Sequence, residues 1–139
     1  DVLRGCACPV VLTPHDGEFL RLGGDPKADD RTREAMRLAS RSHAVVLLKG
    51  SRTVITDGLN TYVNHTGNPG LARGGSGDVL AGITAALLAC GLPAFEAAAC
   101  AVYLHGAAAD RAAALHGETG MLPHDLLDAL GTLFAENGR

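Results

Sequence analysis

The sequence predicts an α/β fold, in which helices pack against a sheet that is at least partly parallel. Residues 9–13 and 44–49 are short apolar runs rich in Val and Leu, which are typical of buried strands. Residues 26–42 lie between them and carry apolar side chains at helical spacing, which completes a strand–helix–strand unit. From residue 77 onward the pattern is mostly helical.

The first elements have clear boundaries. The strand over residues 9–13 ends at Pro14, and a short helix over residues 17–22 should stop at two glycines. The helix over residues 26–42 should turn one face toward the core, made of Ala35, Leu38, Ala39 and Ser42. A second face carries Arg33, Arg37 and Arg41. This arginine stripe could attract anions, but we expect a solvated surface.

A hairpin and three helices follow. Residues 53–56 and 61–64 flank a turn-forming segment, a pattern that predicts two antiparallel strands. Residues 77–90 and 95–116 form two helices rich in small residues, which allow close packing. The last helix, over residues 125–136, should face the core through Leu126, Leu127, Leu130, Leu133 and Phe134.

Length and composition indicate a single folded domain over residues 1–139. The chain is 47% hydrophobic and 19% charged, which excludes a disordered chain. Its net charge of -3 disfavours a nucleic-acid-binding module, because such modules usually carry a basic patch. The uncharged stretch over residues 79–95 is too short and too interrupted for a membrane span. The spacing of the four cysteines fits neither a disulfide scaffold nor a zinc site. We therefore expect them to be buried or neutral thiols in a reducing cytoplasm.

A glycine-rich segment precedes the first long helix of the second half. Gly74, Gly75 and Gly77 surround Ser76 where that helix begins. Helix starts expose unpaired N–H groups, and glycines let an anion approach them closely. Asp78 would lie in the first turn, facing the same space. The segment therefore predicts a phosphate or oxyanion site, although a plain tight turn capped by an aspartate fits the local pattern equally well.

Several ordered motifs share a resemblance to one family. They are Leu-Thr-Pro-His-Asp-Gly-Glu at 12–18, Leu-Lys-Gly-Ser-Arg-Thr at 48–53, Gly-Asn-Pro-Gly at 67–70, Gly-Gly-Ser-Gly-Asp-Val-Leu-Ala-Gly at 74–82 and Val-Tyr-Leu-His-Gly at 102–106. The chain resembles the ADP-dependent NAD(P)H-hydrate dehydratases of the ribokinase-like superfamily over residues 9–130. The resemblance implies a three-layer αβα, Rossmann-like fold, which this chain would contain in part.

The resemblance also implies a repair reaction. NADH or NADPH that has added water to its nicotinamide ring would be restored, with ADP, or ATP in some branches, and Mg²⁺ as cofactors. The ring hydroxyl is phosphorylated and phosphate is then eliminated, so the enzyme is a hydro-lyase. Positioning and positive potential do most of the work in such a phosphoryl transfer.

The family pattern assigns roles to individual residues. Asp78 matches the residue that lies at the substrate hydroxyl and would act as the catalytic base. His15 and Asn68 match substrate-binding positions, and Glu18 matches a residue that helps to hold Mg²⁺. The nucleotide-binding positions are Lys49, Gly50, Ser51, Arg52, Thr53 and Gly77. The anion hole is expected from the amides of Gly75, Ser76 and Gly77.

The residues themselves leave plainer roles open. Lys49 could be a strand-end lysine whose stem lies on apolar surface, and Glu18 could be an ordinary helix-start acid. His15 could be a loop histidine with satisfied hydrogen bonds, and Asn68 could be a turn residue. His105 lies in an Ala-rich helix and is expected to be packed or hydrogen-bonded rather than a ligand.

Family domains are about twice as long as this chain, which would correspond to their C-terminal half. Part of the substrate wall and one side of the sheet would then be missing, and an exposed sheet edge favours a homo-oligomer. Two other functions stay open: a small-molecule kinase of the same superfamily, and a non-catalytic fragment that binds adenine nucleotides. Thr13-Pro14-His15 and the Gly-Asn-Pro-Gly motif favour the dehydratase. None of these functions involves nucleic acid or a membrane.

Overall fold

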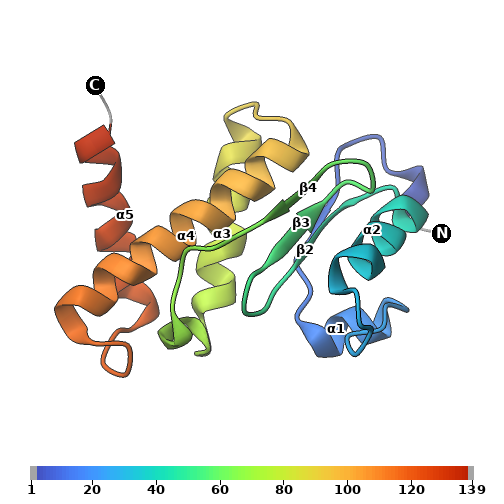
Figure 1. Ribbon diagram of the computed structural model, residues 1–139. Coiled ribbons are helices and arrows are strands. Elements are labelled where there is room, and N and C mark those ends of the chain that lie inside the picture. The colour runs from blue at the N-terminus through green and yellow to red at the C-terminus, as the bar shows by residue number, and fades with distance from the viewer. Residues whose placement is uncertain (1–2, 138–139) are drawn as a thin grey trace. The chain divides into compact units, whose positions relative to one another are not determined.

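The computed structural model describes residues 3–137 and contains one four-stranded sheet and several helices (Figure 1). The chain divides into two compact units, the first up to Asn64 with Leu92–Ala99, the second His65–Gly91 with the chain from Cys100 onward. The elements are 3-10 helices η1 (Leu3–Gly5) and η2 (Pro69–Leu71), strands β1 (Val11–Leu12), β2 (Val45–Leu48), β3 (Val54–Thr56) and β4 (Thr61–Val63), and helices α1 (Asp16–Arg21), α2 (Arg31–Ser42), α3 (Ser76–Ala89), α4 (Ala94–His116) and α5 (Pro123–Asn137).

The sheet of the first unit has the strand order β1-β2-β3-β4. β1 pairs with β2 in parallel, with Val11 opposite Val45, and the connection between these two strands contains α1 and α2. β3 pairs antiparallel with both β2 and β4. The predicted strand–helix–strand unit and the predicted hairpin are therefore both confirmed.

The core of the first unit lies between α2 and the sheet. All four residues of β2 are buried, as expected of an interior strand, and α2 packs against β2 and β3 (Figure 1). Of the face predicted for α2, Ala35, Leu38 and Ala39 are buried, and Ser42 is half-buried and donates to Leu38 O at 2.8 Å. The buried cluster consists of Phe19, Ala35, Leu38, Ala39, Val46, Leu48 and Val54.

The start of α2 differs from the prediction. The helix begins at Arg31 rather than at residue 26, because Asp30 is its N-cap and accepts a hydrogen bond from the Arg33 amide at 2.9 Å. Upstream, the Asp25 side chain accepts a hydrogen bond from the Lys27 amide at 2.9 Å, so this segment forms a non-helical turn. Aspartate side chains compete in this way with helical backbone hydrogen bonds.

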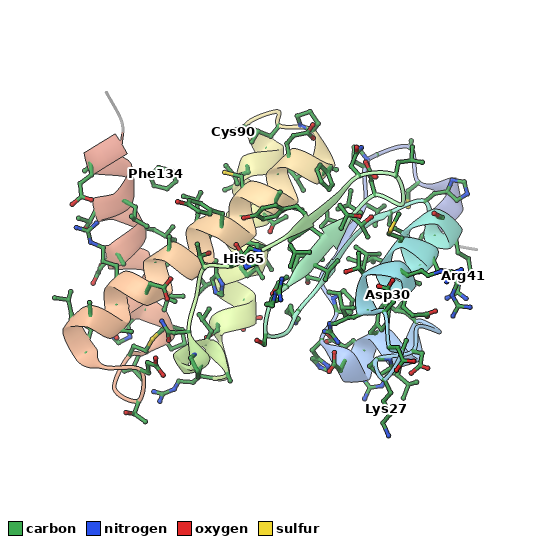
Figure 2. All side chains as sticks on the ribbon, in the orientation of Figure 1. Lys27, Asp30, Arg41, His65, Cys90 and Phe134 are labelled. Atoms are coloured by element: carbon green, nitrogen blue, oxygen red, sulfur yellow. The ribbon has the colours of Figure 1, made fainter. Side chains whose placement is uncertain are left out.

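The second unit is built from α3, α5, η2 and most of α4. Its buried cluster consists of Ala108, Ala109, Ala112, Met121, Leu126, Ala129 and Leu130, with Leu133 partly buried against it. The prediction that Leu127 and Phe134 also face the core is wrong, because their side chains are 56% and 55% exposed. Both residues lie outside the narrower stripe of α5 that reaches the core, and Phe134 extends from the helix (Figure 2).

The structure also bears on the thiols and on membrane insertion. The four cysteines, all of them within the described residues, are free. Three of them, Cys6, Cys8 and Cys90, are exposed rather than buried, because they lie in the N-terminal segment and at the end of α3. Within residues 3–137, none of the helices combines the length and the apolar character that crossing a bilayer requires.

Candidate functional site

The residues between β1 and α1 form the first part of the candidate site. His15 is the N-cap of α1, and its Nδ1 accepts hydrogen bonds from the amides of Gly17 at 3.1 Å and Glu18 at 3.3 Å. Glu18 Oε2 accepts from the His15 amide at 2.8 Å. These reciprocal bonds form a capping box, in which the histidine ring takes the place usually held by serine or threonine. His15 and Glu18 thus have a local structural task, and the exposed His15 ring also has its Nε2 3.5 Å from Glu18 Oε1.

Lys49 follows β2 and joins this cluster. Its amide donates to Pro14 O at 2.9 Å, and its Nζ lies 3.6 Å from Glu18 Oε2. The hydrogen bond from the His15 amide holds the pKa of Glu18 below its ordinary value, and the charge of Lys49 adds to that effect. The parallel pairing of β1 and β2 therefore brings Lys49 close to Glu18, whose neighbour in the capping box is His15.

The turn over residues 50–53, predicted to bind nucleotide, follows Lys49 directly. Arg52 adopts a left-handed conformation with φ 61°, and Thr53 Oγ1 donates to Gly50 O at 3.1 Å. Arg31, which sequence reasoning missed, donates from Nη2 to Lys49 O at 2.6 Å. A Cβ on Gly50 would lie 2.8 Å from the same Arg31 nitrogen, so a larger residue here would displace the end of this flexible side chain.

Arg31 also pairs with Asp16 Oδ1 at 2.8 Å and thereby links the start of α2 to the start of α1. The cluster of the first unit therefore contains two cations, Arg31 and Lys49, balanced by Asp16 and Glu18. The sequence carried no signal for Arg31, because a single arginine at a helix start is common on solvated surfaces.

The glycine-rich start of α3 forms the main feature of the second unit. Gly75 is the N-cap, with φ 93° in the left-handed region that favours glycine, and a Cβ at this position would lie 3.1 Å from Pro123 Cγ. The Ser76 amide donates to Arg73 O at 3.3 Å, so this predicted anion-hole donor is already engaged in a long hydrogen bond. Asp78 is exposed in the first turn, one residue after the half-buried Gly77.

His105 supports this helix start from α4. It is buried, at 7% exposed, and its Nε2 lies 2.9 Å from Ser76 O. A carbonyl oxygen only accepts hydrogen bonds, so Nε2 must carry the proton. Burial lowers the pKa of His105, although its bond to Ser76 O opposes the shift. The prediction that His105 is a packed, hydrogen-bonded residue is confirmed.

Asn68, a predicted substrate-binding residue, is the N-cap of η2. Its Oδ1 accepts from the Gly70 amide at 3.0 Å, and its Nδ2 donates to Asp110 Oδ1 at 3.1 Å. Asp110 lies on α4, and its other carboxylate oxygen accepts from the Gly67 amide at 2.9 Å. Sequence reasoning missed Asp110, which lies 42 positions away from Asn68.

A magnesium ion, which the resemblance implies, would find one candidate carboxylate in the first unit. Magnesium is usually held by one or two carboxylates together with water and substrate phosphates. Glu18 Oε2 is already occupied by the His15 amide and faces Lys49. In the part of the chain that the structure describes, no three His, Cys, Asp or Glu side chains gather as metal ligands. Glu18 alone does not make up a magnesium site, so water and nucleotide phosphates would have to supply the other ligands.

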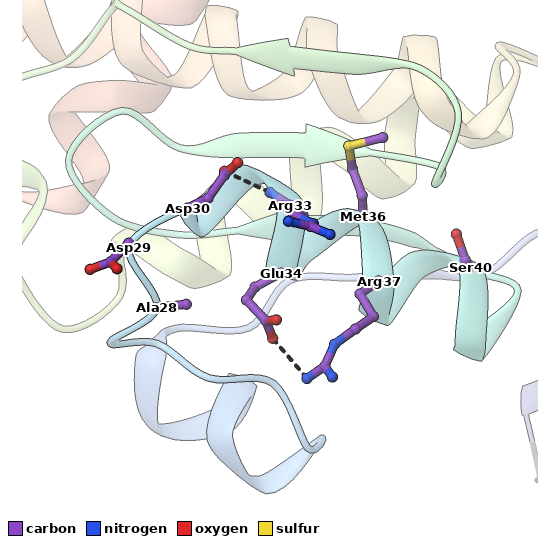
Figure 3. A pocket seen from close by; sticks show the side chains of 8 residues that line it. All are labelled: Ala28, Asp29, Asp30, Arg33, Glu34, Met36, Arg37 and Ser40. Carbon is purple, nitrogen blue, oxygen red and sulfur yellow. Dashed lines mark hydrogen bonds and ion pairs between the residues drawn. The ribbon is translucent and has the colours of Figure 1, made fainter.

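A surface groove on α2 offers a different candidate (Figure 3). It contains Arg33 and Arg37 from the predicted arginine stripe, but Asp29, Asp30 and Glu34 line it as well. Arg37 is paired with Glu34 at 2.9 Å, so the positive charge is locally neutralised. The third arginine, Arg41, donates to Leu22 O at 2.8 Å. The groove contains none of the predicted site residues.

Comparison with known proteins gives one consistent result. Residues 3–131 match a family model described as NAD(P)H-hydrate dehydratase. The chain is 52% identical over 134 residues to a bifunctional NAD(P)H-hydrate repair enzyme from Moorella thermoacetica, a match that covers 93% of this chain and 25% of that protein.

Solved structures agree. The structure is similar to an ADP/ATP-dependent NAD(P)H-hydrate dehydratase from Bacillus subtilis co-crystallized with ATP/Mg²⁺ and soaked with CoA, with a TM-score of 0.86 and 38% identity over 92% of this chain and 49% of that one. It is also similar to a ribokinase-like superfamily protein from Enterococcus faecalis, with a TM-score of 0.81 and 34% identity over 94% of this chain and 46% of that one. The predicted ribokinase-like α/β fold is therefore confirmed. The chain spans about a quarter of the Moorella relative and about half of each solved structure.

Proposed function

Because the chain belongs to the NAD(P)H-hydrate dehydratase family, we propose that it contributes to the nucleotide-dependent dehydration of hydrated NADH and NADPH. The observation that carries this proposal is the start of α3. Gly75 turns the chain in a left-handed conformation, and the exposed Asp78 carboxylate follows in the first helical turn. A helix start of this kind combines donors for phosphate oxygens with a carboxylate that can accept a proton.

The reaction transfers a phosphoryl group and then eliminates it. The ring hydroxyl of the hydrate attacks the terminal phosphorus of ADP, AMP leaves, and Asp78 accepts the hydroxyl proton. Phosphate then leaves with the electron pair of the ring C–O bond, and a neighbouring ring proton is lost as the C=C bond forms. Hydrated NADH and ADP give NADH, AMP and phosphate, and the oxygen of the added water ends in phosphate.

The other predicted residues receive roles that suit their surroundings. We assign the adenine nucleotide to Lys49, the turn over residues 50–53 and the Gly77 amide, and the hydrate to His15 and Asn68. Lys49 is the cation that directly precedes this turn, and its amide donates to the carbonyl oxygen of Pro14, the residue before His15. ADP binding to the chain is further supported by the nucleotide dependence named for the Bacillus relative.

The proposal includes the setting of the reaction. We expect a cytoplasmic homo-oligomer that acts on small molecules and not on nucleic acid. Four thiols without a disulfide suit a reducing compartment, and the net charge of -3 disfavours phosphate-backbone binding.

Purified protein should convert hydrated NADH to NADH only when ADP or ATP is present. Asp78→Asn should lower kcat by roughly 100- to 10,000-fold, because an amide cannot accept the hydroxyl proton, while the hydrate still binds. Absorbance of NADH and release of phosphate measure turnover, and calorimetric titration measures binding. Asp128→Asn on α5 is the matched control, since it also removes one exposed carboxylate. Near-normal turnover by Asp78→Asn would remove this residue from the base role.

Two alternatives have distinct outcomes in the same assay. A stable phosphorylated alcohol without NADH formation would identify a kinase. A raised melting temperature with ADP but no turnover would leave a nucleotide-binding fragment, since a ligand that binds only the folded state stabilises it. If neither AMP nor ADP raises the melting temperature at millimolar concentrations, the proposed nucleotide site is wrong.

A further inference from the structure

The loop over residues 66–70 is held against α4 by three contacts that the sequence did not predict. The Gly67 amide and the Asn68 side-chain amide both donate to the Asp110 carboxylate, at 2.9 and 3.1 Å. Thr66 Oγ1 donates to Tyr103 O at 3.0 Å. A Cβ on Gly106 would lie 2.6 Å from the backbone carbonyl carbon of Thr66, so the loop approaches α4 where only glycine fits.

This network fixes which way the Asn68 amide group faces. An ionised carboxylate accepts hydrogen bonds but cannot donate them, so Asn68 must present Nδ2 to Asp110. Its Oδ1 then accepts from the Gly70 amide at 3.0 Å. Turning the amide over would place acceptor against acceptor at Asp110 and donor against donor at Gly70. A side-chain amide has two donors and two lone pairs, and one of each stays available at Asn68.

We infer that Asp110 is a positioning residue for the dehydratase reaction. It orients the Asn68 amide so that the remaining N–H and lone pair face the polar groups of the nicotinamide nucleotide, and it does not contact the reacting atoms itself. This inference rests on the proposed function for its substrate, whereas the contacts among Gly67, Asn68 and Asp110 are independent of it. Small displacements of substrate-positioning groups are costly in enzymes, by about 100-fold for a shift of 1 Å.

A reciprocal exchange of the two side chains tests the inference. In Asp110→Asn one amide faces another, and in Asn68→Asp one carboxylate faces another, so each single variant breaks the network. In the double variant, the new amide at position 110 would donate to the new carboxylate at position 68 and accept from the Gly67 amide. The carboxylate at position 68 would still accept from the Gly70 amide. Every donor then regains an acceptor.

Two measurements are made on each variant in the whole protein. Amide hydrogen exchange at Gly67 and Gly70 reports the order of the loop, and steady-state kinetics separates KM for hydrated NADH from kcat. Asp110→Asn should speed exchange of the Gly67 amide about tenfold. It should raise KM by roughly 10- to 100-fold, with kcat and the ADP-induced rise in melting temperature nearly unchanged. Asp128→Asn is the control for the loss of one exposed charge from this unit.

The double variant decides the outcome. Recovery of slow exchange in the double variant supports the network, because a general structural defect would not be repaired by a second substitution. KM should stay raised in the double variant, because the carboxylate at position 68 has no N–H to offer the substrate. The inference is overturned if Asp110→Asn leaves the exchange rate of the Gly67 amide unchanged. It is also overturned if Asp110→Asn speeds this exchange but leaves KM for hydrated NADH unchanged. Double-variant exchange as fast as in the single variants also overturns it. If the parent protein does not convert hydrated NADH at all, the proposed function fails, and the exchange data still decide whether Asp110 orders the loop.

Discussion

Among single residues, His105 illustrates how one side chain can link the proposed catalytic segment to the core. Its ring is buried in α4 and reaches the Ser76 carbonyl at 2.9 Å, in the first turn of the helix that carries Asp78. Burial of the ring disfavours the imidazolium form, so its pKa is lowered in the folded state. The neutral ring already carries the Nε2 proton that bonds to Ser76 O. A second proton would create a charged imidazolium, which water hydrates in the unfolded chain but not in the buried site.

This pKa shift predicts a pH-dependent stability. Below the ordinary histidine pKa of about 6.5, the unfolded chain binds a proton at His105 more readily than the folded chain does. The stability contributed by the neutral ring is therefore complete above that value and is lost as the pH falls toward the lowered folded pKa. His105→Gln keeps an N–H near Ser76 O but does not titrate. Urea unfolding between about pH 7 and pH 5 should show a smaller loss of stability for this variant than for the parent. Parallel curves would contradict the expectation.

Among the secondary-structure elements, α1 combines a structural cap with a candidate binding position. His15 accepts two backbone hydrogen bonds and Glu18 returns one, so the short helix starts at a fixed place. The contact between Glu18 and Lys49 at 3.6 Å then joins the helix start to the end of β2. The plain and the functional interpretation of His15 are therefore compatible, and a suitable pair of variants separates them.

His15→Asn and His15→Ala form this pair. Asparagine is a preferred N-cap and should preserve stability, whereas alanine should cost about 1 kcal/mol of unfolding free energy. Both variants remove the imidazole, so both should raise KM for hydrated NADH if His15 binds the substrate. Chemical denaturation and steady-state kinetics measure the two effects. A KM that changes only in the alanine variant would show that His15 acts through the cap alone.

In the molecule as a whole, one long helix runs through both units. The first unit has its core around β2 and α2, and the second has its core around α4 and α5. Helix α4 begins in the first unit and continues in the second, because the boundary falls after Ala99. Helix formation is cooperative along its length, so we expect the loss of either core to propagate to the other.

Leu48→Ala and Leu126→Ala test this coupling. Both side chains are fully buried, one in each cluster, and each substitution should cost about 2–5 kcal/mol. Scanning calorimetry should show a single transition that moves to lower temperature in both variants. Two separate transitions, of which each variant shifts only one, would show that the units unfold independently.

Most of the elements, and the chemistry they carry, could be predicted from the amino-acid sequence. Periodicity and β-branched runs predicted the strand–helix–strand unit and the hairpin, and glycines predicted the start of α3, because these signals depend on neighbouring residues. Ordered motifs placed Lys49 and Asp78 in a family pattern. The start of α2 was predicted too early, because the Asp30 side chain caps the helix and the residues before it are not helical.

The meeting of distant residues could be known only from the folded chain. Asp110 reaches Asn68 across 42 positions and Arg31 reaches the Lys49 carbonyl across 18, and neither residue type is unusual at its own position. The burial of Leu126 beside an exposed Leu127 also depends on the fold, because neighbouring elements set the width of the helix stripe that is covered. Local sequence encodes local conformation, whereas hydrogen bonds between elements arise only when folding brings their partners within about 3 Å.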